Sequence, residues 1–156
     1  MSTAFHNQFT LKDFGKKGKG LLCLEYVQPN KTIFEFTGNV FDTLPVEKSS
    51  YFQISKNRFL GPSGDLDDYV NHSCNPNCWI DILGNRIFLK SLYVLTPNTE
   101  VTIDYSLLFT KEYQYCDFSC ICGTLPCRKR IGGWDSLTSP QQKHYLDLDI
   151  IPGYQK

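Results

Sequence analysis

Short apolar runs separated by polar turn residues set the pattern of this chain of 156 residues. The runs are rich in β-branched and aromatic residues, and Gly and Pro lie between them, which is typical of strands joined by turns. This pattern predicts strands at Leu21–Val27, Thr32–Thr37, Tyr51–Ile54, Cys78–Ile82 and Arg86–Leu92. Gly84-Asn85, between the last two, indicates a hairpin turn. We therefore expect a mostly β protein built from short strands.

The clearest helix pattern lies near the end of the chain. Ser139-Pro140-Gln141-Gln142 offers an N-cap at Ser139 and a proline at the first helical position. Apolar residues then follow at Tyr145, Leu146 and Leu148. The segment predicts one helix of two or three turns.

Composition and charge narrow the class of protein. Hydrophobic residues make up 41% of the chain, enough for the core of one domain, and 16 Lys and Arg balance 16 Asp and Glu. This balance argues against a disordered chain and against a basic nucleic-acid binder. Four nearby lysines form only a local patch, which is typical of a solvated face: Lys12, Lys16, Lys17 and Lys19.

The apolar segments are too short for a membrane protein. Runs such as Leu21-Leu22-Cys23-Leu24 fall far below the roughly 20 residues of a membrane span. Residues 1–10 lack the charged and then apolar pattern of a signal peptide. We expect no membrane association and an intracellular location, with the nucleus, the cytoplasm and delivery as a secreted effector all left open.

Cysteine is the unusual residue in this sequence. The chain has seven, an odd number, and three of them share the pattern Cys120-x-Cys122-x4-Cys127. Such spacing lets three sulfurs converge on one tetrahedral ion, with a fourth ligand from elsewhere. Spacing alone leaves Cys116, Cys74 and Cys78 as candidates for that ligand, and buried free thiols remain the plain alternative.

A second polar cluster is Asn71-His72-Ser73-Cys74-x-Pro76-Asn77. Taken alone it fits an Asx-rich loop with a structural histidine. Along the chain it precedes Glu100-Val101-Thr102-Ile103-Asp104-Tyr105 and then the cysteine pattern. These three motifs, with Gly18-Lys19-Gly20 before them, resemble the SET-domain family of protein lysine methyltransferases over about residues 16–128.

The resemblance implies a fold and its boundaries. In that family several small sheets surround a pseudoknot, in which the segment with the Asp-Tyr motif threads through the loop with the Asn-His motif. We therefore expect a SET domain at residues 1–115, a post-SET zinc segment at 116–133 and a C-terminal helical extension at 134–156. The implied cofactors are S-adenosylmethionine and zinc.

The resemblance also implies roles for single residues. Tyr105 is the expected catalytic residue, with Tyr51 in the wall of the lysine channel. Ile103 stands where many members carry Phe or Tyr, and its smaller side chain leaves room for di- or trimethylation. The expected residues at the S-adenosylmethionine site are Gly18, Lys19, Gly20, Tyr69, Asn71, His72 and Ile121, with Trp134 either covering the cofactor or in the core. The expected zinc ligands are Cys74, Cys120, Cys122 and Cys127.

The implied partner is a protein that presents a lysine, either a histone tail or a non-histone protein. Nucleic acid is not expected as a direct partner, and the chain is expected to be a monomer. The alternative is a catalytically silent SET-like module that binds a protein tail. Two features suggest this alternative: Asp68-Tyr69, where family members often carry Arg-Phe, and Ile103, where many carry Phe or Tyr.

Overall fold

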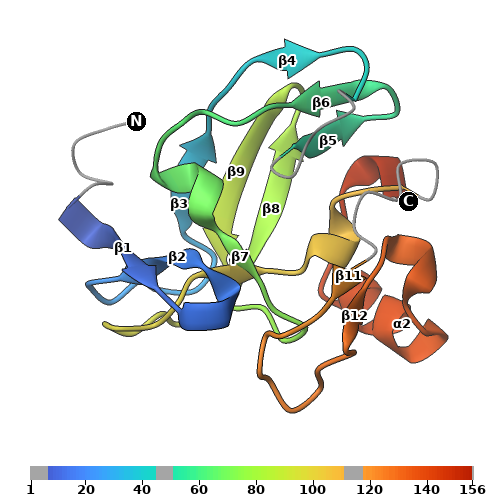
Figure 1. Ribbon diagram of the computed structural model, residues 1–156. Coiled ribbons are helices and arrows are strands. Elements are labelled where there is room, and N and C mark those ends of the chain that lie inside the picture. The colour runs from blue at the N-terminus through green and yellow to red at the C-terminus, as the bar shows by residue number, and fades with distance from the viewer. Residues whose placement is uncertain (1–6, 45–50, 111–117, 156) are drawn as a thin grey trace.

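The computed structural model describes residues 7–44, 51–110 and 118–155 (Figure 1). Its strands are β1 (Phe9–Asp13), β2 (Lys19–Cys23), β3 (Thr32–Phe36), β4 (Val40–Phe41), β5 (Phe52–Ser55), β6 (Arg58–Leu60), β7 (Asn71–His72), β8 (Cys78–Leu83), β9 (Arg86–Ser91), β10 (Thr102–Ile103), β11 (Phe118–Ser119) and β12 (Arg130–Ile131). The helices are α2 (Ser139–Asp147) and the short 3-10 helices η1 (Gly15–Lys17), η2 (Leu66–Tyr69), η3 (Tyr105–Leu107), η5 (Trp134–Ser136) and η6 (Gly153–Gln155).

The strands form several small sheets, as the family resemblance implies. One sheet has the order β3-β9-β8 and another the order β4-β6-β5, and β1 pairs with β2, β7 with β10, and β11 with β12. In Figure 1 the β3-β9-β8 sheet lies between the β4-β6-β5 sheet and the β1-β2 ribbon, while α2 lies to one side with β11 and β12. The mostly β expectation is therefore confirmed.

The β8-β9 hairpin shows how local sequence positions the core. Leu83 pairs with Arg86 across a two-residue turn, and Gly84 there has a positive φ of 63° that suits glycine. Side chains alternate along β9, so that Ile87 and Leu89 are fully buried. They pack with Phe34 and other residues in the main hydrophobic core of the molecule.

The C-terminal helix forms a second, smaller core. Leu107, Leu137, Tyr145, Ile150 and Ile151 are buried together there. Trp134 packs against this cluster, so the structure places it with the core.

The predicted N-cap of this helix is corrected by one residue. Thr138 is the N-cap, and it forms a capping box with Gln141, while Ser139 and Pro140 lie in the first turn. Both Thr138-x-x-Gln141 and Ser139-x-x-Gln142 fit the capping-box pattern, which explains the one-residue error. The predicted length of two or three turns is confirmed by the nine residues of α2.

Within residues 7–44, 51–110 and 118–155, no helix combines the length and the apolar character that crossing a membrane requires. Cys116, one of the candidate zinc ligands, and most of the segment tested for a signal peptide lie outside these described ranges.

Candidate active site

The parallel pair of β7 and β10 brings two distant motifs together. Asn71 lies opposite Thr102 and His72 opposite Ile103, and the Ser73 amide donates to the Ile103 carbonyl at 2.9 Å. The Asn77 side chain adds a further link, because its oxygen accepts from the Thr102 amide at 2.9 Å. The expected meeting of the Asn-His and Asp-Tyr motifs is thus confirmed.

Tyr105 begins η3, separated from β10 only by Asp104, and is held at both ends. Its amide donates to Nδ1 of His72 at 3.1 Å, and its hydroxyl donates to the Val70 carbonyl at 2.8 Å. A hydroxyl that donates its proton keeps lone pairs with which to accept. The Tyr105 oxygen can therefore attract an electron-poor methyl group or accept from an amine.

His72 is buried and uncharged at neutral pH. Burial lowers its pKa to about 4, and this effect outweighs the nearby Asp104 carboxylate. Since Nδ1 accepts from Tyr105, the ring proton of the neutral histidine belongs on Nε2. Nε2 lies 3.3 Å from Sγ of Cys74 and can donate to it. His72 therefore connects the backbone of Tyr105 to the cysteine cluster.

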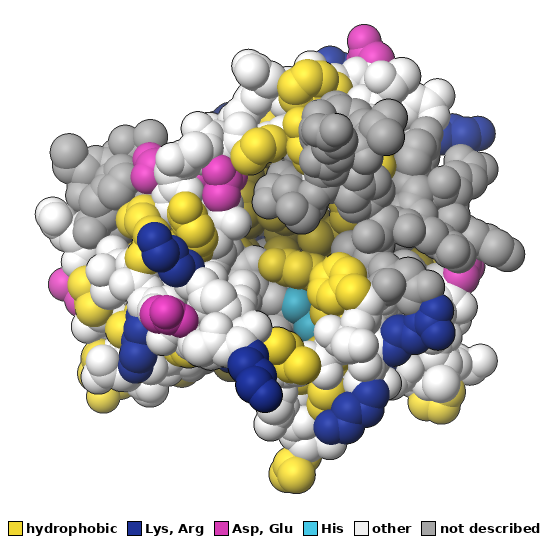
Figure 2. Space-filling view, viewed as in Figure 1, with side chains coloured by type: hydrophobic (Ala, Val, Ile, Leu, Met, Phe, Trp, Pro, Cys, Tyr) yellow, Lys and Arg dark blue, Asp and Glu magenta, His cyan; other side chains and the backbone are white. Residues whose placement is uncertain are grey.

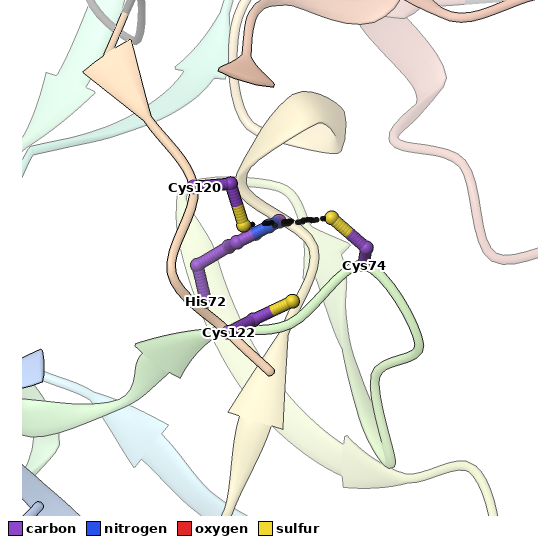
Figure 3. A group of neighbouring side chains, drawn as sticks. All are labelled: His72, Cys74, Cys120 and Cys122. Atoms are coloured by element: carbon purple, nitrogen blue, oxygen red, sulfur yellow. Dashed lines mark hydrogen bonds between the residues drawn. The ribbon is translucent and has the colours of Figure 1, made fainter. Parts of the chain in front are cut away.

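The cysteine cluster joins the Asn-His loop to the C-terminal segment. In Figure 3 the side chains of His72, Cys74, Cys120 and Cys122 point toward one another, and their possible ligand atoms all lie within 4.8 Å of each other. The sulfurs of Cys74 and Cys120 are 3.6 Å apart. Burial raises the pKa of both thiols, so a cation is needed to keep both as thiolates near neutral pH. This donor set fits zinc.

The group of four side chains contains His72, whereas the predicted fourth zinc ligand is Cys127. His72 belongs to the group, whereas Cys127 lies beside it, with Sγ 3.8 Å from the backbone oxygen of Cys120. A His72 that carries its proton on Nε2 donates to a thiolate and does not ligate through that atom. Three of the four predicted ligands are therefore brought together, and Cys127 stays a prediction.

A cavity of about 280 Å³ opens beside Tyr105. In Figure 2 a hollow with a histidine at its base is flanked by hydrophobic side chains, with Lys and Arg side chains along its lower edge. The lining residues are Lys16, Lys17, Asn71, His72, Tyr105, Phe118, Ser119, Ile121, Cys122 and Ile131. The cavity thus combines the Asn-His motif, the tyrosine and the cysteine segment in one place.

Comparison with known proteins gives this arrangement a family. Residues 18–106 match the family model described as the SET domain. This chain belongs to the SET-domain family. The matched residues begin just after Lys17 and end just after Tyr105, so the cavity of this SET domain combines matched residues with Lys16 and Lys17 before them and with the cysteine segment after them.

Relatives of this SET domain include named enzymes. The chain is 31% identical to Histone-lysine N-methyltransferase ASHH2 of Arabidopsis thaliana, over 88% of this chain and 9% of the relative. It is also 31% identical to a Candida albicans histone-lysine N-methyltransferase described as H3 lysine-36 specific, over 75% of this chain and 16% of the relative. The chain therefore spans less than a fifth of the length of these two relatives.

Solved structures agree on the fold. A crystal structure of KRYPTONITE in complex with mCHG DNA and SAH matches with a TM-score of 0.65 and 27% identity, over 80% of this chain and 29% of that chain. A second KRYPTONITE structure, with mCHH DNA, an H3(1-15) peptide and SAH, also has a TM-score of 0.65, with 25% identity, over 79% of this chain and 29% of that chain.

The two glycines of the predicted cofactor turn have different roles in this SET domain. Gly18 has a positive φ of 76°, which disfavours other residues, and it ends η1. Lys19 and Gly20 already belong to β2. A Cβ at Gly20 would lie 2.5 Å from the side-chain nitrogen of Asn71, so this glycine makes room for Asn71. Lys19 and both glycines lie next to the lining of the cavity but do not form it.

Lys16 and Lys17 line the cavity instead, and sequence reasoning placed them only in a basic patch. Lys17 pairs with the Glu100 carboxylate, which also accepts from the Asn71 side chain at 2.9 Å. The Lys17–Glu100–Asn71 chain therefore connects η1 to β7. Lys16 and Lys17 directly precede Gly18 of the predicted cofactor turn, and this position was the sequence signal that could have placed them at the cavity.

Other predicted residues lie around the cavity. Ile121 lines it, and about half of its surface is exposed. Tyr69 ends η2 next to Val70 and is not part of the lining. Tyr51 is buried against Phe41, with ring centroids 5.6 Å apart, and Ile103 is buried in the main core. The roles assigned to these residues stay predictions.

Sequence reasoning missed a buried ion pair behind Tyr105. Both carboxylate oxygens of Asp104 accept from the Arg128 guanidinium at 2.7 Å, and Tyr145 donates to the same carboxylate at 2.5 Å. Burial alone would raise the pKa of Asp104, but the hydrogen bonds and charge of Arg128, together with His72 and Tyr145, lower it overall. The available signal was one aspartate between the buried Ile103 and Tyr105, and one arginine directly after Cys127.

Proposed function

We propose that this chain transfers methyl groups from S-adenosylmethionine to the side-chain amine of a lysine in a protein substrate. The observation that carries the proposal is the Tyr105 hydroxyl, bonded to the Val70 carbonyl, in the wall of a cavity of about 280 Å³. The names of the relatives and the SAH in both KRYPTONITE structures support the same activity. SAH is S-adenosylmethionine without its transferable methyl group.

The cavity offers groups that suit this cofactor. Phe118 and Ile121 present apolar surface for an adenine ring, and the backbone of Asn71 and His72 offers polar groups beside it. Lys16 supplies positive charge for the carboxylate of the methionine part, whereas the charge of Lys17 is already paired with Glu100. The donor set around Cys74 would hold zinc, which would fix Phe118 and Ile121 opposite Asn71.

The chemistry requires alignment and an uncharged nucleophile. A free lysine has a pKa of about 10.4, so removing its proton at pH near 7.4 costs about 4 kcal/mol. A buried channel and the sulfonium charge of the bound cofactor both lower that cost. The Tyr105 oxygen can then accept from the amine or attract the methyl group, and no strong general base is needed.

The substrate we propose to test first is the N-terminal tail of histone H3. One KRYPTONITE structure contains an H3(1-15) peptide, and one relative is described as H3 lysine-36 specific. A non-histone protein with a suitable lysine remains the second substrate class. We further expect the chain to act as a monomer inside cells, without nucleic acid as a direct partner.

The position of Asp68 argues against a catalytically silent module. Its carboxylate accepts from the amides of Ser63 at 2.9 Å and Gly64 at 2.7 Å, so its charge stabilises its own loop. Asp68 is not part of the cavity lining. Its negative charge is therefore satisfied by backbone donors and does not oppose cofactor binding.

Calorimetric titration of zinc-loaded protein with S-adenosylmethionine separates the two functions. An enzyme should bind one cofactor per chain, and labelled cofactor should then transfer methyl groups to histone H3 or to proteins of a cell extract. A protein that binds an H3 peptide but neither binds nor uses the cofactor would establish the silent module.

A further inference from the structure

The C-terminal extension, described over residues 134–155, contacts the segment that carries Tyr105. The first contact is a hydrogen bond of 2.5 Å from the Tyr145 hydroxyl to the Asp104 carboxylate. Tyr145 lies in α2 and is only 4% exposed, and Asp104 directly precedes Tyr105. The extension therefore reaches the residue next to the catalytic tyrosine.

Two further side chains bind the carbonyl groups that follow Tyr105. The Tyr154 hydroxyl donates to the Leu108 carbonyl at 2.6 Å, and the Gln155 amide donates to the Phe109 carbonyl at 2.8 Å. Carbonyls at the end of a helix lack partners within it, and η3 ends at Leu107. The extension supplies partners for the residues that follow this end.

Apolar packing adds to these polar contacts. Leu107, the last residue of η3, is 4% exposed and belongs to the same buried cluster as Leu137, Tyr145 and Ile150. Residues outside the extension hold the same segment: Tyr105 is bonded to Val70 and His72, and Arg128 donates to Asp104 and Ser106. The extension therefore provides one of several sets of contacts that hold residues 104–109.

We propose that the C-terminal extension is a positioning element for Tyr105, acting through Tyr145 on Asp104 and through Tyr154 and Gln155 on the backbone that follows. This inference rests on the proposed methyl transfer. A reaction without a strong base depends on alignment, and a displacement of about 1 Å can cost about a hundredfold in rate. None of the three side chains lines the cofactor cavity. We therefore expect their loss to lower the rate of methyl transfer and to leave cofactor binding unchanged.

Tyr145→Phe is the direct test, because it removes one hydroxyl and keeps the ring in its cluster. The matched control is Tyr26→Phe, since Tyr26 is 71% exposed and lies far along the chain from η3. We expect Tyr145→Phe to lower kcat at least fivefold, with the KM for the cofactor and the number of cofactors bound per chain unchanged. Tyr26→Phe should match the parent. A kcat within twofold of the parent at full cofactor binding would overturn the proposal.

A second variant guards against a Tyr145→Phe protein that does not fold. Tyr154→Phe with Gln155→Ala removes the carbonyl contacts and leaves Asp104 untouched, and it should lower kcat in the same way. Hydrogen exchange of the Leu107 and Leu108 amides should be at least tenfold faster in either variant, while the Val101 amide, bonded to Leu21, keeps its rate. Unchanged exchange would contradict the proposal.

The two measurements keep the two claims apart. An inactive parent would overturn the proposed function and with it the catalytic meaning of these contacts. An active parent whose kcat and amide exchange are unchanged in both variants would overturn the positioning role alone.

Discussion

Replacing Arg128 with alanine should test how much the buried ion pair stabilises this fold. The guanidinium donates twice to Asp104, at 2.7 Å each, and once to the Ser106 hydroxyl at 2.9 Å. The Asp104 side chain is 0% exposed and that of Arg128 is 12% exposed. Removal of Arg128 would leave a buried carboxylate with only neutral partners and a neutral histidine nearby.

The expected loss in unfolding free energy is about 3 kcal/mol. Breaking a buried ion pair by removing one partner costs about 3–5 kcal/mol, and the slight exposure of Arg128 lets water reach the emptied space, which favours the lower end. Arg86→Ala is the matched control, because Arg86 also grips a carboxylate, that of Glu35, with two hydrogen bonds while its side chain is 63% exposed. Its loss should be far smaller, since exposed pairs contribute little.

Urea unfolding of the zinc-loaded proteins at neutral pH measures both losses. Asp104→Asn combined with Arg128→Ala should recover part of the stability, because the unpaired charge is then gone. The pKa of Asp104 is lowered in the parent, so its contribution is present above the unfolded pKa of about 3.9 and is lost as pH falls through the lower folded value. Equal losses for Arg128→Ala and Arg86→Ala would refute this reasoning.

Three further predictions concern the site. Tyr105→Phe should keep cofactor binding and lower the single-turnover transfer rate at least tenfold, and a rate within twofold of the parent would assign Tyr105 to packing. Ile103→Tyr should stop at an earlier methylation state than the parent in exhaustive reactions followed by mass spectrometry, and a parent limited to one methyl group would show that Ile103 does not set the number. Metal analysis should find one zinc per chain in the parent and little zinc in Cys74→Ser or Cys127→Ser. The controls Cys78→Ser and His72→Asn should keep near-normal zinc. Loss of zinc in His72→Asn with retention in Cys127→Ser would instead make His72 the fourth ligand.

Secondary-structure elements that are determined by residues close together in the sequence could be predicted. The β8-β9 hairpin follows from Gly84-Asn85 between two alternating runs, and α2 follows from its cap and its proline. The predicted N-cap was wrong by one residue, because Thr138 and Ser139 both fit the capping-box pattern. Family resemblance, and not spacing, singled out Cys74 as the partner of the C-terminal cysteines, and the structure places it among them.

Contacts between distant segments could not be predicted. Asp104 is the N-cap of η3, Arg128 follows the cysteine pattern, and Tyr145 lies in α2. Nothing in the local sequence around any one of them indicates a buried ion pair. These residues meet because three distant segments pack together, and the local pattern of apolar and polar residues does not predict such packing. The same holds for Gly20, whose need for a small side chain arises from Asn71, about 50 positions along the chain.

The central claim is that the cavity beside Tyr105 supports methyl transfer to lysine. Mass spectrometry of an H3 tail peptide, incubated with S-adenosylmethionine and the zinc-loaded protein, tests it most directly. We predict methyl groups on lysine with the parent and a strongly reduced yield with Tyr105→Phe under the same conditions. A parent that binds the cofactor but leaves every lysine of the histone H3 tail and of an extract of cellular proteins unmodified would contradict the account.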